Sequence, residues 1–152
     1  MTFDAALQRL HTHYQSMPPV AAMNVGISGY DGKRLRLRAP LSHHVNDKGC
    51  AFGGSLASVM TLASWGLVSL GLELADLRAE VFVADSQIRY LAPLFGDLEV
   101  QAELADGADW DLFVQTLRGR GRARTGLVAR ALLPEGGVAT EFTARYVAIA
   151  KA

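Results

Sequence analysis

One uncharged stretch limits the folds available to this chain more than any other feature. Residues 55–72 contain no Lys, Arg, Asp or Glu, and their large apolar side chains recur at helical spacing. On a helical wheel, one side carries Leu56, Met60, Ala63, Leu67 and Leu70, and the opposite side carries Ser58, Thr61 and Ser69. A helix without charges has to be enclosed on nearly all sides. Because Gly, Ala, Ser and Thr fill about half of its positions, it differs from a membrane span, which needs about 20 mostly large apolar residues. The stretch therefore predicts a buried helix packed closely against a sheet.

A polar, glycine-containing loop leads into this helix. Residues 43–54 end in the pair Gly53-Gly54, at the predicted first turn, where several backbone N–H groups have no partner inside the helix. Glycines let a ligand approach the backbone closely, and the helix dipole adds about half a positive charge at this end. Such donors stabilise an oxyanion or a polarised carbonyl. The loop is therefore the first candidate for a functional site.

Charge and cysteine content exclude several classes of function. The 152 residues carry 15 basic and 15 acidic side chains, so no net charge attracts nucleic acid or an anionic membrane. The one cysteine, Cys50, forms neither an internal disulfide nor a cysteine-based metal site, which fits a reducing compartment. The first residues lack the features of a signal peptide, so we expect a cytoplasmic protein. The length fits one domain, and the 50% hydrophobic content suggests an oligomer.

The rest of the sequence predicts one more helix and an antiparallel sheet. Residues 3–14 have helical spacing, with Thr2 as the N-cap. Alternating residues on either side of Asp31-Gly32 predict a β-hairpin over residues 23–39. Further strands are predicted over residues 80–92, 98–104, 112–133 and 138–149, the third of them bent or divided near residues 119–121.

Strict alternation along two of these strands predicts which side chains share a face. Phe82, Ala84, Ile88 and Tyr90 should lie on one face of their strand, opposite Val81, Val83, Asp85, Gln87 and Arg89. Arg118, Arg120, Arg122 and Arg124 should form a row along the other strand. Such a row either binds the phosphates of a ligand or forms a solvated sheet surface.

Five motifs carry a resemblance to a known superfamily. Asn46-Asp47-Lys48-Gly49-Cys50-Ala51-Phe52-Gly53-Gly54 resembles the Asn-x-x-Gly-x-x-His-Gly-Gly signature of phenylacetyl-CoA-type thioesterases, and Asp85-x-x-Ile88-x-Tyr90-x-x-Pro93 resembles their following strand. Phe52-Gly53-Gly54-Ser55, Ser64-Trp65-Gly66 and Arg120-Gly121-Arg122-Ala123-Arg124 resemble the thioesterase domain found alone or fused to a GNAT-type acetyltransferase. The resemblance covers nearly the whole chain. It implies a single α+β domain of hot-dog fold over residues 1–152, with an antiparallel sheet of five to six strands wrapped round one long central helix and a short N-terminal helix.

The resemblance also implies a homodimer, sometimes paired again into a tetramer, with two acyl-CoA clefts at the subunit interface. In the phenylacetyl-CoA type, the amide after the signature histidine polarises the thioester carbonyl; that amide matches Gly53 N–H, and the matching asparagine is Asn46. This chain departs from the pattern at three positions. Phe52 replaces the histidine, Thr61 replaces the helix carboxylate, and Val83 replaces a serine of the strand. The usual catalytic base of that type is therefore missing.

The loop and the helix offer substitutes for this base. Asp47 is a base or nucleophile if the cleft desolvates it; otherwise it is a surface residue that caps a turn. Asn46 either lies at the scissile bond or holds the loop by backbone hydrogen bonds. Thr61, with Ser58 and Ser64 nearby, either holds a water molecule or bonds back to the carbonyl four residues earlier.

The remaining substrate-binding candidates are Phe52, Gly54, Asp85, Arg120 and Arg122. Asp85 either lines the subunit interface or belongs to the exposed surface, while the two arginines are candidates for contacts with coenzyme A phosphates. No metal or cofactor is expected. The adjacent side chains of His43 and His44 should diverge in an extended loop, and suitably spaced carboxylates are missing.

The leading hypothesis is a hydrolase of acyl-CoA or acyl-carrier-protein thioesters, acting at a dimer-interface cleft. The alternative is a non-catalytic acyl-CoA-binding or assembly module, because Thr61 replaces the helix carboxylate. A dehydratase is a weaker third hypothesis, because hot-dog dehydratases use a histidine with an acidic partner and Phe52 occupies the signature position. Neither nucleic acid nor a membrane is expected as a partner.

Overall fold

The computed structural model describes residues 2–152. The helices are α1 (Phe3–Ser16), α2 (Pro18–Ala21), the short 3₁₀ helix η1 (Leu41–His43), α3 (Gly53–Leu74) and α4 (Trp110–Arg120). The strands are β1 (Gly26–Tyr30), β2 (Leu35–Ala39), β3 (Ala79–Tyr90), β4 (Leu98–Leu104), β5 (Arg122–Leu132) and β6 (Val138–Ala150). Thr2 caps α1 as predicted, because its hydroxyl accepts a hydrogen bond of 3.3 Å from the Ala5 amide.

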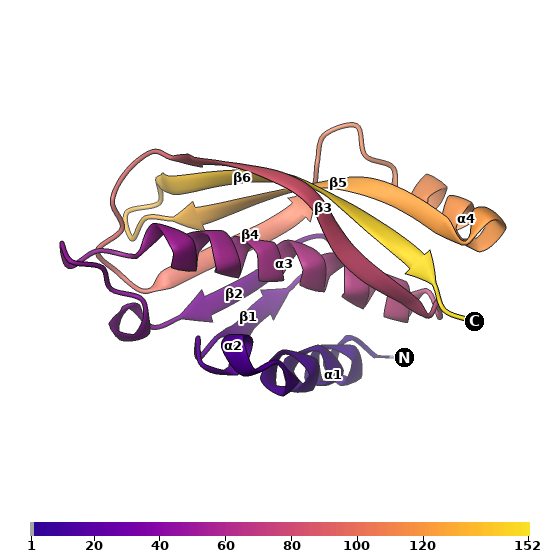
Figure 1. Cartoon of the computed structure of the whole chain (residues 1–152), viewed down its shortest axis with the longest axis horizontal. Coiled ribbons are helices and arrows are strands. Elements are labelled where there is room, and N and C mark those ends of the chain that lie inside the picture. Colours follow the sequence, from indigo (N-terminus) through magenta and orange to yellow (C-terminus); the bar gives the residue numbers. More distant parts are fainter. Residues whose placement is uncertain (1) are drawn as a thin grey trace.

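A single antiparallel sheet of six strands wraps round α3. The strand order is β1-β2-β4-β5-β6-β3, so β1 and β3 are its two edges. Figure 1 shows the sheet curving over α3, with α1 and α2 on the side of the helix away from β5 and β6. This arrangement confirms the predicted α+β fold, with one long central helix and a short N-terminal helix.

The central helix is enclosed as its composition requires. Its buried residues include the predicted apolar side, Leu56, Met60, Ala63, Leu67 and Leu70. Within residues 2–152, α3 is the one helix whose length and hydropathy match a membrane span, and 56% of that window is buried inside the fold. A core helix of a protein folded in water meets the same criteria, so the enclosure by the sheet explains the composition.

Two buried tyrosines anchor the middle of α3. The Tyr14 hydroxyl donates a hydrogen bond of 2.6 Å to the Leu62 carbonyl, and the Tyr146 hydroxyl donates one of 2.8 Å to the Thr61 carbonyl. Burial raises the pKa of both phenols well above the usual value, and for Tyr14 the neighbouring Tyr146 adds to the increase. Both groups therefore remain protonated donors, and they attach α1 and β6 to neighbouring residues of the helix.

The predicted strand over residues 112–121 is wrong, because this segment forms the helix α4. Asp109 caps the helix by accepting a hydrogen bond of 3.1 Å from the Leu112 amide, and Gly121 ends it in a left-handed conformation with φ of 73°. The buried residues Phe113, Val114 and Leu117 follow helical spacing. The predicted row of four arginines is consequently divided, with Arg118 and Arg120 in α4 and Arg122 and Arg124 in β5.

The predicted faces of β3 are also wrong beyond Val83. Val83 pairs with Tyr146 and Asp85 pairs with Arg145, so Ala84 is an extra residue in a β-bulge. The bulge reverses the alternation, which places Asp85 on the outer face of the sheet and leaves Val81 and Val83 on the face toward α3. Phe82, predicted to share a face with Tyr90, lies on the outer face for the same reason.

We predict that Gly66→Ala lowers the free energy of unfolding by about 1–3 kcal/mol. A Cβ atom at this position would lie 2.1 Å from the Tyr14 hydroxyl and 2.9 Å from a Leu35 methyl, and both side chains are fully buried. Gly119→Ala in α4 is the matched control, since its Cβ would meet nothing within 4 Å. The control should stabilise the protein by about 0.5–1 kcal/mol. Urea unfolding of both variants tests this, and equal stabilities would contradict the close tyrosine contact.

Candidate active site

Backbone hydrogen bonds close the glycine-containing loop before α3. The Asn46 amide donates to the Cys50 carbonyl at 2.8 Å, and the Phe52 amide donates to the His44 carbonyl at 2.7 Å. The Ala51 amide donates to the Leu94 carbonyl at 2.8 Å, which ties the loop to the segment after β3. The loop is therefore held in one position beside the first turn of the helix.

The Asn46 side chain is committed to this loop. Its Oδ1 atom accepts hydrogen bonds from the amides of Lys48, at 2.8 Å, and Cys50, at 3.1 Å. Its Nδ2 atom lies 3.3 Å from the buried Cys50 sulfur. Asp47 differs, because its side chain is 81% exposed and pairs with the Lys48 ammonium at 3.0 Å. Within one subunit, Asn46 holds the loop and Asp47 lies in solvent.

A buried histidine links the loop to the helix. The Nε2 atom of His44 lies 2.7 Å from the Met23 carbonyl, and its Nδ1 atom lies 2.8 Å from the Ser55 hydroxyl. Because a carbonyl only accepts, Nε2 must carry a proton and donate it to Met23. The sequence predicted only that the side chains of His43 and His44 diverge, so the link from His44 to Met23 and Ser55 required the structure. His43 is exposed, whereas only 5% of His44 is accessible.

The first turn of α3 presents free backbone donors. No side chain caps the helix, and the first intrahelical bond runs from the Leu56 amide to the Phe52 carbonyl at 3.1 Å. Within residues 2–152, the amides of Gly53 and Gly54 therefore have no backbone partner. Gly54 is exposed, and Phe52 beside it is 56% exposed. The arrangement can bind a carbonyl oxygen or a small anion.

Tyr90 fixes this turn to the end of β3. Its hydroxyl donates a hydrogen bond of 2.9 Å to the Gly53 carbonyl, and its ring would lie 3.3 Å from a Cβ atom at Gly53. A cavity of about 270 Å³ next to it is lined by Ala51, Leu56 and residues 90–94. Tyr90 belongs to the strand motif found in the sequence. Its hydrogen bond to the Gly53 carbonyl explains the role of a tyrosine at this position.

The hydroxyl groups of α3 lie in different surroundings. Thr61 bonds back to the Ala57 carbonyl at 2.8 Å, the structural possibility that the sequence left open. Ser64 is fully buried beside the Tyr146 side chain. Ser58 is half-buried and follows Gly54 by one turn. With Thr61 it continues the partly exposed stripe of the helix that begins at Gly54.

The three remaining candidates lie away from Gly53 in the same subunit. Asp85 forms an ion pair with Arg145, whose guanidinium holds the pKa of that carboxyl below its usual range. Arg122 pairs with Ile149 on β6, while Tyr90 pairs with Thr140 on the same strand. On β6, Ile149 lies nine residues after Thr140, so the two positions are about 30 Å apart along the strand. Arg120 ends α4 beside Arg122, so both arginines lie at the far end of the sheet.

We predict that His44→Ala lowers the free energy of unfolding by about 2–3 kcal/mol, because it removes a buried side chain and leaves the Met23 carbonyl unpaired. The matched control is His43→Ala, which removes an exposed ring and should change stability by less than about 0.5 kcal/mol. Thermal and urea unfolding measure the difference. A His44→Ala variant as stable as the control would contradict the buried link.

Comparisons with known proteins identify the family and the fold of this chain. Residues 6–150 match the family model described as "Putative thioesterase (yiiD_Cterm)". A solved structure from Shewanella oneidensis, titled a putative thioesterase, is 29% identical and superposes with a TM-score of 0.86 over 96% of this chain and 99% of that one. A protein of unknown function from Chlorobaculum tepidum TLS is 28% identical, with a TM-score of 0.92 over 99% of this chain and 98% of its own.

A Pseudomonas aeruginosa protein titled a probable thioesterase shares the fold at 21% identity, with a TM-score of 0.81 over 99% of this chain and 97% of that one. The family match covers nearly the whole chain, and the sheet wrapped round α3 is the hot-dog fold of these thioesterases. The chain therefore belongs to the putative thioesterase family described as yiiD_Cterm and has the hot-dog fold.

Proposed function

We propose that this protein hydrolyses acyl thioesters of coenzyme A or of an acyl carrier protein. One observation carries the proposal: the uncapped first turn of α3 offers the Gly53 amide to a ligand beside an exposed Gly54. An amide at a helix N-terminus stabilises the negative charge that develops on a thioester oxygen during attack. Membership of the thioesterase family supports the same chemistry. A cytoplasmic location fits the lone cysteine, Cys50.

We propose that the active form is a homodimer paired through β3. The resemblance also implies that two such dimers can pair into a tetramer. β3 is an edge strand, so one row of its backbone groups has no partner within residues 2–152. Phe82 and Val83 on this strand are 47% and 43% exposed, and Tyr90 and Leu91 at its end are 56% and 48% exposed. A two-fold pairing of this edge would cover the apolar side chains and complete the sheet.

In the proposed reaction, the thioester oxygen accepts the Gly53 N–H and water attacks the carbonyl carbon. The Thr61 hydroxyl donates to Ala57, so it offers its lone pairs to orient that water. Asp47 is the loop carboxylate available to take the proton once a partner subunit and the substrate displace solvent. The tetrahedral intermediate then expels the thiolate, which is protonated to the thiol. Asn46 holds the loop so that the Gly53 amide stays aimed at the oxygen.

The other proposed contacts surround this centre. Phe52, Gly54 and Ser58, at the start of α3, are the proposed contacts for the acyl chain. Ser64 lies further along the same helix. Asp85 lies at the middle of β3, where a two-fold axis would bring both copies together. Arg120 and Arg122 lie at the end of the sheet that would adjoin the partner's loop, so they are available to the phosphates of the carrier.

A non-catalytic acyl-CoA-binding module is the second candidate. The observation that favours it is Thr61, whose hydroxyl is tied to its own helix at the position of the carboxylate in the phenylacetyl-CoA type. Such a module would bind an acyl-CoA without releasing free thiol. A thiol-release assay across acyl chain lengths, together with calorimetry, separates the two functions.

We predict that Gly53→Pro lowers kcat for thioester hydrolysis by about 100- to 1000-fold, because it deletes the amide donor. Proline is favoured at the first position of a helix, and the extended backbone of Phe52 tolerates it. Gly53→Ala is the matched control, because it adds a Cβ near Tyr90 but keeps the N–H. Equal kcat values for the two variants would rule out this amide as the oxyanion donor.

We predict that the wild-type protein sediments as a dimer and that Val83→Glu shifts it toward the monomer, because a charge on the β3 edge opposes its burial. Leu112→Glu is the control, since Leu112 is 59% exposed but lies on α4. Analytical ultracentrifugation over a concentration series makes the comparison. A wild-type monomer at all concentrations, or equal dissociation constants for the two variants, would refute pairing through β3.

A further inference from the structure

A buried imidazole lies directly behind the first turn of α3, and the reaction described above does not use it. The Nδ1 atom of His44 lies 2.8 Å from the Ser55 hydroxyl, and its Nε2 atom lies 2.7 Å from the Met23 carbonyl. Because Nε2 donates to that carbonyl, the basic lone pair of a neutral ring lies on Nδ1, toward Ser55. A hydroxyl, a basic nitrogen and a third group that orients the ring are the parts with which proteins accept a proton during hydrolysis.

Ser55 lies on the same turn as the proposed amide donor. It is the third residue of α3 and half-buried, so part of it is accessible from outside. Side chains of a helix lean toward its N-terminus, and one at the third position reaches back beside the N-cap residue, here Phe52. The helix rises only about 3 Å between Gly53 and Ser55. A water molecule bonded to the Ser55 hydroxyl would therefore reach a carbonyl carbon whose oxygen is held by the Gly53 amide.

His44 is already fixed in this position in the single subunit. Its backbone carbonyl accepts the Phe52 amide at 2.7 Å, and its ring contacts Ser55, so it is bonded on both sides of the glycine pair. Asp47 differs, because its side chain is 81% exposed and pairs with the Lys48 ammonium. A preorganised group needs no rearrangement at the moment of reaction. The pair of Ser55 and His44 meets this condition without a change of solvent exposure.

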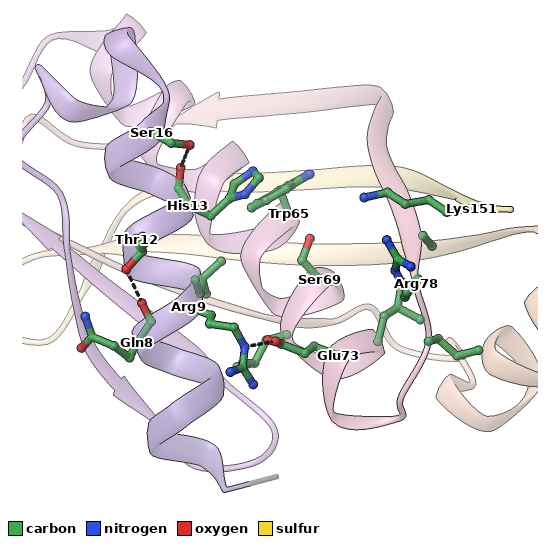
Figure 2. A pocket seen from close by; sticks show the side chains of 15 residues that line it. Gln8, Arg9, Thr12, His13, Ser16, Trp65, Ser69, Glu73, Arg78 and Lys151 are labelled. Carbon is green, nitrogen blue, oxygen red and sulfur yellow. Dashed lines mark hydrogen bonds and ion pairs between the residues drawn. The ribbon is translucent and has the colours of Figure 1, made fainter.

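Another histidine near a serine lacks this arrangement. Figure 2 shows His13 in a cavity of about 580 Å³ between α1 and α3, where its ring stacks on Trp65 with centroids 5.2 Å apart. The nearby Ser16 hydroxyl donates to the backbone carbonyl of His13 at 2.6 Å and leaves the ring alone. Within residues 2–152, only the His44 ring has hydrogen-bond partners at both nitrogens. Its pairing with a hydroxyl is therefore specific to the first turn of α3.

We propose that Ser55 and His44 form a proton relay that activates the water for thioester hydrolysis. The inference rests on the proposed hydrolase function and gives its water a proton acceptor in addition to Asp47. As the water oxygen bonds to the carbonyl carbon, one water proton passes to Ser55 Oγ and the Ser55 proton passes to His44 Nδ1. The carbonyl π electrons move to the oxygen held by the Gly53 amide. The Met23 carbonyl keeps its hydrogen bond from Nε2 and stabilises the charged ring.

The relay returns the proton when the tetrahedral intermediate collapses. The carbon–sulfur bond breaks, and its electron pair leaves with the sulfur. The Nδ1 proton of His44 passes back to Ser55, whose own proton passes to the thiolate. The products are a carboxylic acid and a free thiol, and no acyl group is bonded to the protein. The relay thereby supplies the base that is missing where Thr61 replaces the helix carboxylate of the phenylacetyl-CoA type.

Steady-state kinetics of the intact protein test the relay, with acetyl-, hexanoyl- and palmitoyl-coenzyme A as probes and free thiol as the readout. His44→Gln keeps an N–H donor for the Met23 carbonyl but has no basic nitrogen, and Ser55→Ala removes the hydroxyl. Each variant should lower kcat by about 100-fold or more and leave KM unchanged, because both groups act only in the transition state. The double variant should be no slower than the slower single variant, since the two residues act as one unit.

The chain offers a matched control pair next to this site. The Ser42 hydroxyl lies 3.3 Å from Nδ1 of His43, and both residues are exposed. His43→Gln and Ser42→Ala should therefore keep the wild-type kcat. Circular dichroism and urea unfolding show whether each variant is folded, and Ser55→Ala alone provides the test if His44→Gln does not fold. If His44 only held the loop in place, His44→Gln would keep kcat, and the relay would be refuted.

The remaining outcomes separate the relay from the hydrolase function itself. Wild-type kcat in Ser55→Ala, or loss of activity in Asp47→Asn alone, would overturn the relay and leave the hydrolase function in place. An acyl ester on Ser55, detected by mass spectrometry after a rapid acid quench, would also overturn it, because the relay forms no covalent intermediate. If the wild type releases no thiol from any of the three probes, the hydrolase function and the relay both fail.

Discussion

The structure depends on the burial of one uncharged helix. α3 has to be removed from water on most of its surface, and the sheet achieves this by curving round it while α1 covers another side. Tyr14 and Tyr146 then attach α1 and β6 to successive carbonyls of the helix. These two hydrogen bonds fix the rotation of α3 in the sheet, and that rotation decides which of its side chains remain accessible.

The position of the candidate site follows from this enclosure. A buried helix can expose free amides only at its end, and Gly53 and Gly54 lie there beside Tyr90. The same stripe of α3 continues through Ser58 to Thr61.

Much of the fold could be predicted from the sequence, because its strongest signals are local. The uncharged helix, the Asp31-Gly32 hairpin and the cap at Thr2 all depend on residues within a few positions of one another. The segment of α4 was predicted as a strand because Leu112, Val114 and Thr116 also fit strand alternation, although Asp109 and Gly121 mark the two ends of a helix. The β-bulge at Ala84 has no signature of its own, so the face of Asp85 was unpredictable. For the candidate site, the motif suggested Gly53 as the donor, which stays a prediction. The contacts of His44 and Tyr90 join residues distant in the chain and required the structure.

The central claim is that a thioester carbonyl binds the free amides at the first turn of α3. The most direct measurement is a crystal structure with an acyl-CoA analogue in which a methylene group replaces the sulfur. The account predicts the ketone oxygen at about 2.7–3.1 Å from the Gly53 nitrogen. A carbonyl bound away from Gly53 would contradict it.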